Sequence, residues 1–231
     1  MNDRLLKIWH EWRGFVLFVA VMLVFRSAIA DWNQVPSGSM KPSILDGDRI
    51  VVDKLAFDLR VPFTLTRIAQ WGDPERGDVV TFPNPKDERL FVKRVVGIPG
   101  DVVEMRRNVL IINGERATYT PLSKAEIDAL PIARPEKFKF FREKILGSER
   151  VVMLEARSRR PSWSSFGPLT VPEGHYWMMG DNRDNSNDSR DPGLGFVDRE
   201  RVVGRAHAIA FSVDYDRYYA PRLERFFTDL P

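Results

Sequence analysis

An apolar segment near the N-terminus constrains the fold of this chain most, because it divides the sequence into a candidate membrane anchor and one following domain. The twelve residues Gly14 to Phe25 carry no charge. Alone they fall short of the roughly 20 residues that cross a bilayer. Trp12 and Trp32 flank them, and a helix between these indoles spans about 30 Å, which suits two interfacial aromatic belts. We therefore expect one transmembrane helix within residues 1–32.

The charges around this segment predict its orientation. Arg4, Lys7 and Arg13 precede the apolar run, so the positive-inside rule places the N-terminus in the cytoplasm and everything after Trp32 outside it. A cleavable signal peptide is the alternative, since a basic start and an apolar run precede Ala28-Ile29-Ala30, with the cut before Asp31. The charge of Arg26 between the run and that cut favours a retained anchor.

The stretch from Val35 to Asp48 follows the anchor and cannot be helical. Pro36 and Pro42 lack a backbone N–H, and each disfavours helical geometry in the residue before it. Gly38 permits close backbone approaches next to Ser39. The stretch therefore predicts either a serine on a rigidly placed turn or a plain linker between anchor and domain.

From Asp48 onward the sequence is typical of strands. Branched and aromatic residues fill segments 49–57, 77–82, 89–98, 101–105, 108–117, 170–181 and 196–214. Alternate apolar positions predict a further half-buried strand over 57–65, with Pro62 marking it as an edge or hairpin. Asn113-Gly114 is a strong two-residue hairpin signal. We expect a mainly β fold with Greek-key or barrel-like closure.

Residues 118–167 differ from the strands on either side. Ser123 and Glu126 form a capping-box pattern that predicts a short helix ended by Pro131, and prolines and basic residues follow. We expect a small β-rich or irregular insertion, mobile in part and without a catalytic role. The predicted organisation is an anchor over 1–32, a discontinuous β domain over 33–117 plus 168–231, and the insertion over 118–167.

Composition excludes several classes of chemistry. The chain has no cysteine, which rules out disulfides, thiolate metal sites and a cysteine nucleophile. Its net charge of +3 is scattered without a basic stripe, so no nucleic-acid partner is indicated. Asp184, Ser186 and Asp188 faintly resemble the start of a calcium loop, but Ser189 stands where that loop needs glycine. We expect no metal and no cofactor, and a monomer by default.

A nucleophilic serine needs a base, and three exported residues are candidates. His175 and His207 lie in strand-like segments, where a half-buried structural histidine is the commoner case. Lys93 lies among apolar neighbours, and burial of its ammonium would lower its pKa and leave it substantially neutral near pH 7. The alternative is that Lys93 extends to solvent at the sheet edge while Arg94 faces inward.

Three motifs in a fixed order decide between these alternatives. They are PSGSM-x-P at 36–42, VKRVVGIPGD at 92–101 and GDNRDNSNDSR at 180–190. Together with the anchor they resemble the type I signal peptidases, membrane-anchored Ser-Lys proteases of bacteria that release exported preproteins from their signal peptides. The resemblance covers nearly all of the chain outside residues 118–167.

The resemblance implies a role for each matching residue. Ser39 is the expected nucleophile and Lys93 the general base, with Ser37 donating to the oxyanion and Ser186 hydrogen-bonding the lysine. The resemblance also implies charged support residues in the third motif, namely Asp181, Arg183, Asp188 and Arg190. It implies three residues that line the substrate pocket, namely Val35, Ile44 and Val92.

The resemblance also implies a substrate and a place. The substrates would be preproteins with Ala-x-Ala type sites, and the catalytic domain would face the extracytoplasmic side of the bacterial plasma membrane. Two features depart from the family pattern: Phe91 stands where many relatives have tyrosine, and one anchor is found where many Gram-negative members have two.

Two other functions are compatible with parts of the sequence. A self-cleaving repressor-type Ser-Lys protease shares the expected β core, but it needs a DNA-binding domain that residues 1–32 cannot supply. An inactive membrane-tethered adaptor would need none of the reactive side chains. The joint presence of Ser37, Ser39, Lys93 and Ser186 favours the peptidase over the adaptor.

Overall fold

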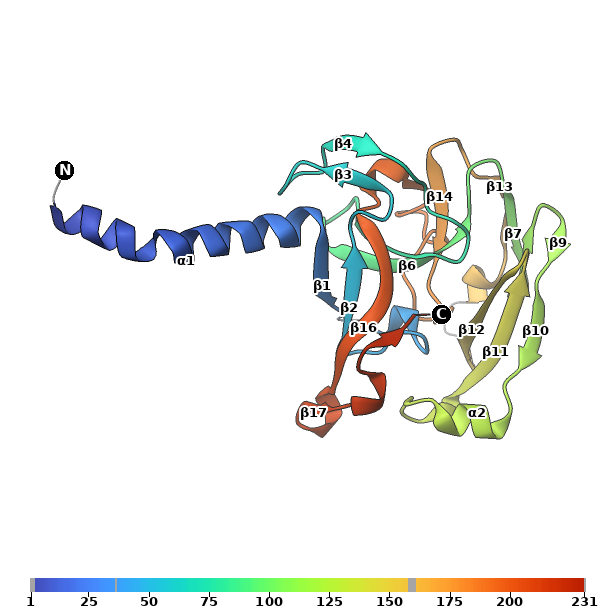
Figure 1. Ribbon diagram of the computed structural model, residues 1–231. Coiled ribbons are helices and arrows are strands. Elements are labelled where there is room, and N and C mark those ends of the chain that lie inside the picture. Colours follow the sequence, from blue (N-terminus) through green and yellow to red (C-terminus); the bar gives the residue numbers. More distant parts are fainter. Residues whose placement is uncertain (1–2, 36, 158–160, 231) are drawn as a thin grey trace.

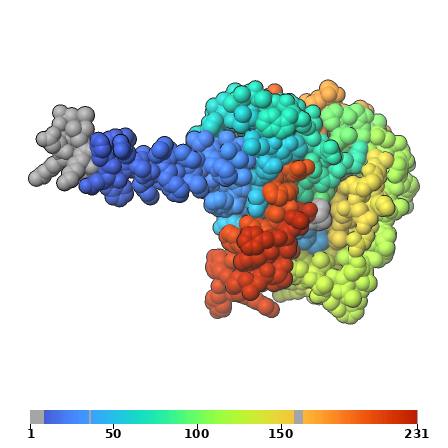
Figure 2. All heavy atoms as spheres, in the orientation of Figure 1, coloured from blue at the N-terminus to red at the C-terminus, as the bar shows by residue number. Residues whose placement is uncertain are grey.

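A long helix leads into a body made of strands. The computed structural model describes residues 3–35, 37–157 and 161–230, so Pro36 of the first motif lies outside the described residues. Helix α1 (Asp3–Ala28) projects away from the body, as Figures 1 and 2 show. Its apolar side chains are exposed, with Leu17 65% and Phe18 62% accessible.

The membrane-spanning part of the expectation is not confirmed. A helix does form over the predicted anchor, but among the described residues no helix is both long enough and apolar enough to cross a membrane.

The largest sheet brings together the two ends of the chain. Its longest strand, β16 (Gly204–Asp214), is antiparallel to β2 (Asp48–Asp53) on one side and to β5 (Val79–Pro83) on the other. The sheet runs in the order β1 (Ala30–Gln34), β2, β16, β5, β6 (Leu90–Gly97), β14 (His175–Met179) and β15 (Val197–Asp198), with β17 (Ala220–Pro221) and β18 (Thr228–Asp229) also paired to β16. Segments far apart in sequence therefore become neighbours around β6.

Three smaller sheets complete the strand architecture. They are β13 (Phe166–Thr170), β7 (Val102–Arg106), β8 (Val109–Ile112) and β9 (Glu115–Arg116); β10 (Thr118–Pro121), β11 (Phe138–Ile145) and β12 (Ser148–Glu155); and the pair β3 (Asp58–Arg60) and β4 (Arg67–Gln70). Asn113 and Gly114 join β8 to β9 with positive φ angles of 52° and 82°, as the hairpin signal predicts. The mainly β class is confirmed.

The helical elements besides α1 are short. Helix α2 (Lys124–Ala129) begins at the capping box of Ser123 and Glu126 and ends before Pro131, as predicted. Single 3-10 turns cover Gly38–Met40 (η1), Pro135–Lys137, Pro161–Ser164, Arg199–Arg201, Tyr215–Arg217 and Leu223–Arg225. Of these, η1 carries the serine of the first motif.

The strand predicted over 57–65 is wrong beyond its first residues. Only β3 (Asp58–Arg60) is a strand, and the chain then turns back toward β4. Phe63 has a positive φ of 64° and is 71% exposed. Pro62 has no N–H for a ladder, so the alternate apolar residues lie on a turn rather than on a core-facing strand.

The apolar core is continuous across the predicted domain boundary. One buried cluster joins Val96 of β6 and Trp177 of β14 to Val103 of β7 and Ile145 of β11. Segment 118–167 therefore packs into the same core as the strands around it. Its residues 138–155 form a regular hairpin, which fits the β-rich of the two forms that the sequence predicted rather than the irregular one.

A buried ion-pair cluster fixes this hairpin to the third motif. Glu143 of β11 is fully buried and pairs with both Arg150 and Arg183. Two backbone hydrogen bonds of 2.9 Å join Met153 of β12 to Asp181 and Arg183. Burial by itself raises the pKa of Glu143, but Arg150 and Arg183 outweigh it and lower that pKa to about 2.

We expect Glu143→Ala to destabilise the fold by about 3–5 kcal/mol, because it leaves two arginines without their buried carboxylate. Glu126→Ala is the matched control, since this exposed glutamate of the same segment pairs with Arg142 at the surface. Urea unfolding followed by tryptophan fluorescence measures the difference. Equal unfolding midpoints for the two variants would contradict a stabilising role for the cluster.

The Glu143 cluster also predicts an acid sensitivity. Because the folded pKa of Glu143 is about 2, its contribution is present above the unfolded pKa of about 4.3 and is lost as pH falls from there toward 2. Glu143→Gln should flatten this part of the stability profile. A wild-type profile that remains flat between pH 4.5 and pH 2 would contradict it.

Candidate active site

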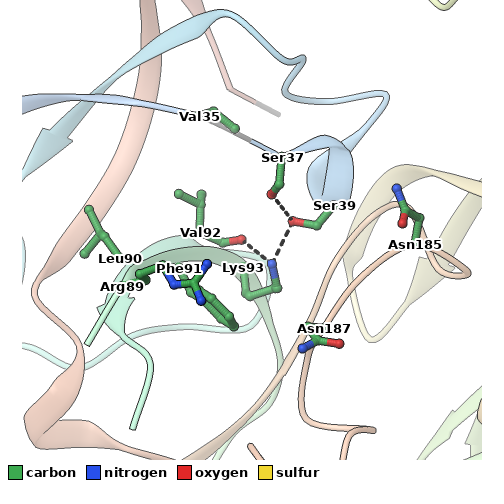
Figure 3. A pocket seen from close by; sticks show the side chains of 10 residues that line it. All are labelled: Val35, Ser37, Ser39, Arg89, Leu90, Phe91, Val92, Lys93, Asn185 and Asn187. Carbon is green, nitrogen blue, oxygen red and sulfur yellow. Dashed lines mark hydrogen bonds between the residues drawn. The ribbon is translucent and has the colours of Figure 1, made fainter. Parts of the chain in front are cut away.

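Two side chains from the first and second motifs meet in the interior. The Nζ atom of Lys93 lies 2.7 Å from the Oγ atom of Ser39 and donates a second hydrogen bond of 3.0 Å to the carbonyl oxygen of Val92. Both side chains are almost fully buried, with 7% of Ser39 and 3% of Lys93 exposed. Figure 3 shows the Lys93 amine and the Ser39 hydroxyl pointing toward each other at the cavity.

The turn that carries Ser39 is held by the third motif. Asn182 donates through Nδ2 to the carbonyl oxygen of Gly38 at 2.9 Å and through its backbone to that of Ser39 at 3.1 Å. Gly180 lies under the same turn, where an added Cβ would come within 2.4 Å of the Ser39 carbonyl oxygen. Only glycine allows this approach, so the third motif fixes the position of the serine.

Strand β6 places Lys93 where water is scarce. The strand lies between β5 and β14, and all six of its residues from Val92 to Gly97 are buried. Burial lowers the pKa of Lys93 to about 8, and the nearby Asp188 and Asp181 only partly offset this effect. A neutral amine near neutral pH is a competent general base.

The two acids near Lys93 are already paired with arginines. Asp181 accepts two hydrogen bonds from Arg94, at 2.8 and 3.0 Å, and one from Ser43 at 2.6 Å. Asp188 accepts from Arg190 at 2.8 and 2.9 Å and from the backbone N–H of Gly180 at 3.0 Å. Burial raises the pKa of Asp188, but Arg190 outweighs it, so the net shift is downward.

Arg94 was missed as a partner of the third motif. Lys93 and Arg94 are adjacent, so they point to opposite faces of β6, and both faces are buried. Arg183, predicted to support the same loop, pairs instead with Glu143 of the hairpin. The signal that could have indicated such a distant carboxylate is an arginine within an apolar strand segment that has no acidic residue beside it.

The predicted supporting serines lie at different places. Ser37 borders the cavity, with its Oγ atom 3.3 Å from that of Ser39. Ser186 is 1% exposed, and its Oγ atom makes no hydrogen bond to Lys93. The bond from Ser186 to Lys93 that the resemblance implied is therefore not formed in this structure, although Ser186 remains packed beneath Gly180.

A cavity of about 340 Å³ opens onto Ser39 and Lys93. Of the three predicted pocket residues, Val35 and Val92 line it, while Ile44 is fully buried behind them in the same apolar cluster. The complete lining is Val35, Ser37, Ser39, Arg89, Leu90, Phe91, Val92, Lys93, Asn185 and Asn187. Periodicity alone could not identify Asn185 and Asn187, because they lie on an irregular loop.

The histidines take no part in this arrangement. Neither His175 nor His207 lines the cavity, and His175 contacts the carbonyl oxygen of Glu173 through Nδ1 at 2.9 Å. Within the described ranges, no group of three or more His, Asp or Glu side chains is placed to hold a metal ion. The chemistry available at the cavity is that of a serine hydroxyl beside an amine of lowered pKa.

Comparison with known proteins gives a consistent result. The family described as signal peptidase, peptidase S26, matches residues 9–211. Signal peptidase I of Pseudomonas fluorescens is 40% identical over 210 residues, which cover 87% of this chain and 71% of that protein. The same enzyme of Rickettsia typhi is 33% identical over 218 residues, with 88% and 80% covered.

A solved structure is also similar in sequence. The crystal structure of a signal peptidase I from Enterococcus faecalis is 30% identical and covers 57% of this chain and 95% of its own, with a TM-score of 0.34. That overall superposition is too weak to support the fold, which is established by the strands themselves. The family match and the long alignments confirm the resemblance, and this chain belongs to the signal peptidase family of serine peptidases, peptidase S26.

Proposed function

We propose that this protein is a membrane-bound serine endopeptidase that cleaves signal peptides from exported preproteins after small residues, at sites of the Ala-x-Ala type. Ser39 is the nucleophile and Lys93 is the general base. The observation that carries this proposal is the 2.7 Å approach of Nζ to Oγ in an almost fully buried setting. A nucleophile within hydrogen-bond reach of a base of lowered pKa is the arrangement that acyl transfer requires.

The first half of the reaction forms an acyl-enzyme. Neutral Lys93 takes the hydroxyl proton of Ser39 as Oγ attacks the scissile carbonyl carbon, and the carbonyl oxygen becomes an oxyanion. The Ser37 hydroxyl, 3.3 Å from the attacking oxygen, and the Ser39 backbone N–H are proposed to donate to that oxyanion. The C–N bond then breaks, and Lys93 returns the proton to the leaving amine, which is the new N-terminus.

The second half releases the signal peptide. Lys93, neutral again, takes a proton from a water molecule while the water oxygen attacks the acyl carbon. The bond from this carbon to Ser39 Oγ breaks, and the proton on Nζ passes to the serine oxygen. No group other than the dyad changes its covalent state, so the surrounding ion pairs need only hold the two residues in place.

The shape of the cavity supports the preference for small residues. Val35 and Val92 form apolar walls close to Ser39, and Leu90 extends them along β6. Ile44 fills the space behind these walls, so the subsites are shallow. Small apolar side chains next to the cut fit such walls, while large ones would have to displace buried residues.

Helix α1 supports the proposed membrane location. Its apolar side chains are exposed over several turns. Trp12, within the helix, is 55% exposed, and Trp32, in β1 just after the helix, is 47% exposed. We propose a single anchor in the bacterial plasma membrane, with the N-terminus in the cytoplasm and a monomeric catalytic domain on the extracytoplasmic side. The Ala30–Asp31 bond lies in β1, paired with β2, which supports a retained anchor over self-cleavage.

We expect Ser39→Ala and Lys93→Ala each to lower preprotein processing by at least about 10³-fold, because each removes an essential half of one unit. The measurement is processing of a preprotein with an Ala-x-Ala site by detergent-solubilised enzyme, with the cut mapped by mass spectrometry. His175→Ala and His207→Ala are the controls and should process at the parent rate. Undiminished processing by Lys93→Ala would contradict the assignment of Lys93 as the general base.

The lowered pKa of Lys93 predicts the pH dependence of kcat/KM. Only the neutral amine acts as a base, so activity should rise with pH up to about 8 and level off above it. Two pH units below that value, the rate should be about 100-fold lower. A profile measured on a soluble peptide that stays flat down to about pH 5 would contradict a lysine base.

The anchor predicts how the protein fractionates. In a bacterial host it should stay in the membrane pellet through an alkaline carbonate wash and leave it only with detergent, because the apolar face of α1 remains in lipid. External protease should digest the catalytic domain in spheroplasts. Release by carbonate alone, or protection of the domain from external protease, would contradict the proposed location.

A further inference from the structure

The cavity differs in chemistry on the two sides of the dyad. On one side Val35, Leu90 and Val92 present apolar surface, and on the other side lie Asn185 and Asn187. Figure 3 shows this arrangement plainly, with Ser39 and Lys93 between the two groups. A peptide whose scissile bond lies at Ser39 therefore has the residues on one side of that bond against apolar side chains and the residues on the other side against amides.

The two asparagines are presented by a loop whose other side chains are fixed. Asp184, Ser186 and Asp188 are all buried, whereas Asn185 and Asn187 between them are exposed. Asp184 accepts the backbone N–H of Glu155 at 2.8 Å, and Asp188 accepts that of Gly180 at 3.0 Å. The buried side chains fix the loop to the protein interior, and the two amides between them line the cavity.

Neither amide contacts another polar group in the part of the chain that the structure describes. Among the described residues, the side chains of Asn185 and Asn187 form no hydrogen bond with any other group. A carboxamide offers two donors and an acceptor, which complement the N–H and C=O groups of an extended peptide. Such contacts are independent of side-chain identity, which suits a segment that differs from one exported protein to the next.

We propose that Asn185 and Asn187 bind the backbone of the residues that follow the scissile bond, the start of the mature protein. This proposal rests on the proposed function, in which the acyl flank of the substrate lies on the apolar walls of Val35 and Val92. The leaving flank then continues past Lys93 toward the two amides. They are positioning residues for the substrate, since neither is placed to exchange a proton with Ser39.

Two substrates with one common acyl part test this role. The first is a peptide that continues for six residues beyond an Ala-x-Ala site, and the second ends at the cut in a 4-nitroanilide. For the Asn185→Ala, Asn187→Ala double variant we expect kcat/KM on the long peptide to fall about tenfold or more, mainly through KM. On the anilide it should stay within about twofold of the parent, which also shows that the variant is folded.

Asn33→Ala is the matched control, because Asn33 is a half-buried amide on β1 that does not line the cavity. It should match the parent on both substrates. Equal losses on both substrates by the double variant, or no loss on either, would overturn the proposal. Failure of the parent itself to exceed Ser39→Ala on the long peptide would instead overturn the proposed function, so the two failures are distinguishable.

Discussion

The structure depends on one lysine ammonium group kept out of water without a carboxylate in contact. Desolvation lowers the pKa of Lys93 to about 8, and a direct ion pair would reverse that shift. The acids nearest to it are prevented from forming one, because Asp181 is held by Arg94 and Asp188 by Arg190. The charge arrangement thus allows the amine beside Ser39 to lose its proton much closer to neutral pH than an ordinary lysine does.

This arrangement needs four parts of the chain to meet. The turn η1 brings Ser39, strand β6 brings Lys93, and the loop between Asp181 and Arg190 lies beneath both. The fourth part is the β11–β12 hairpin, which holds that loop through Glu143 and Arg183. Segment 118–167 is therefore a structural support of the active site, and a buried ionic network makes its geometry specific.

The reach of sequence reasoning differs from residue to residue. Ser39, Lys93 and the third motif were predicted to converge because three motifs together resemble one family, and the 2.7 Å contact agrees. Strand periodicity alone favours a Lys93 side chain that reaches solvent, because the alternation rule assumes that one face of the strand is exposed to water. In the structure both faces of β6 are buried, so the rule does not apply there.

The Glu143 ion pairs and the position of Ile44 could not be predicted from the sequence, because both depend on long-range packing. Glu143 lies in a segment of charged and aromatic residues, and its partners Arg150 and Arg183 become visible only when the hairpin packs against the loop. Ile44 was placed in the pocket wall, but the turn after Ser39 directs it into the core behind Val35. Long-range packing decides such cases, whereas local pattern decides the hairpin at Asn113-Gly114.

The most direct test of this account is the titration of the Lys93 amine itself. In protein labelled with ¹³C at lysine Cε, the Lys93 resonance can be assigned by its loss in Lys93→Arg and followed between pH 6 and pH 11. The account predicts a midpoint near 8, well below that of the surface lysines. A midpoint near the ordinary value of about 10.4 would contradict it, because fewer than about one amine in 10³ would then be neutral at pH 7, against about one in ten at a pKa of about 8.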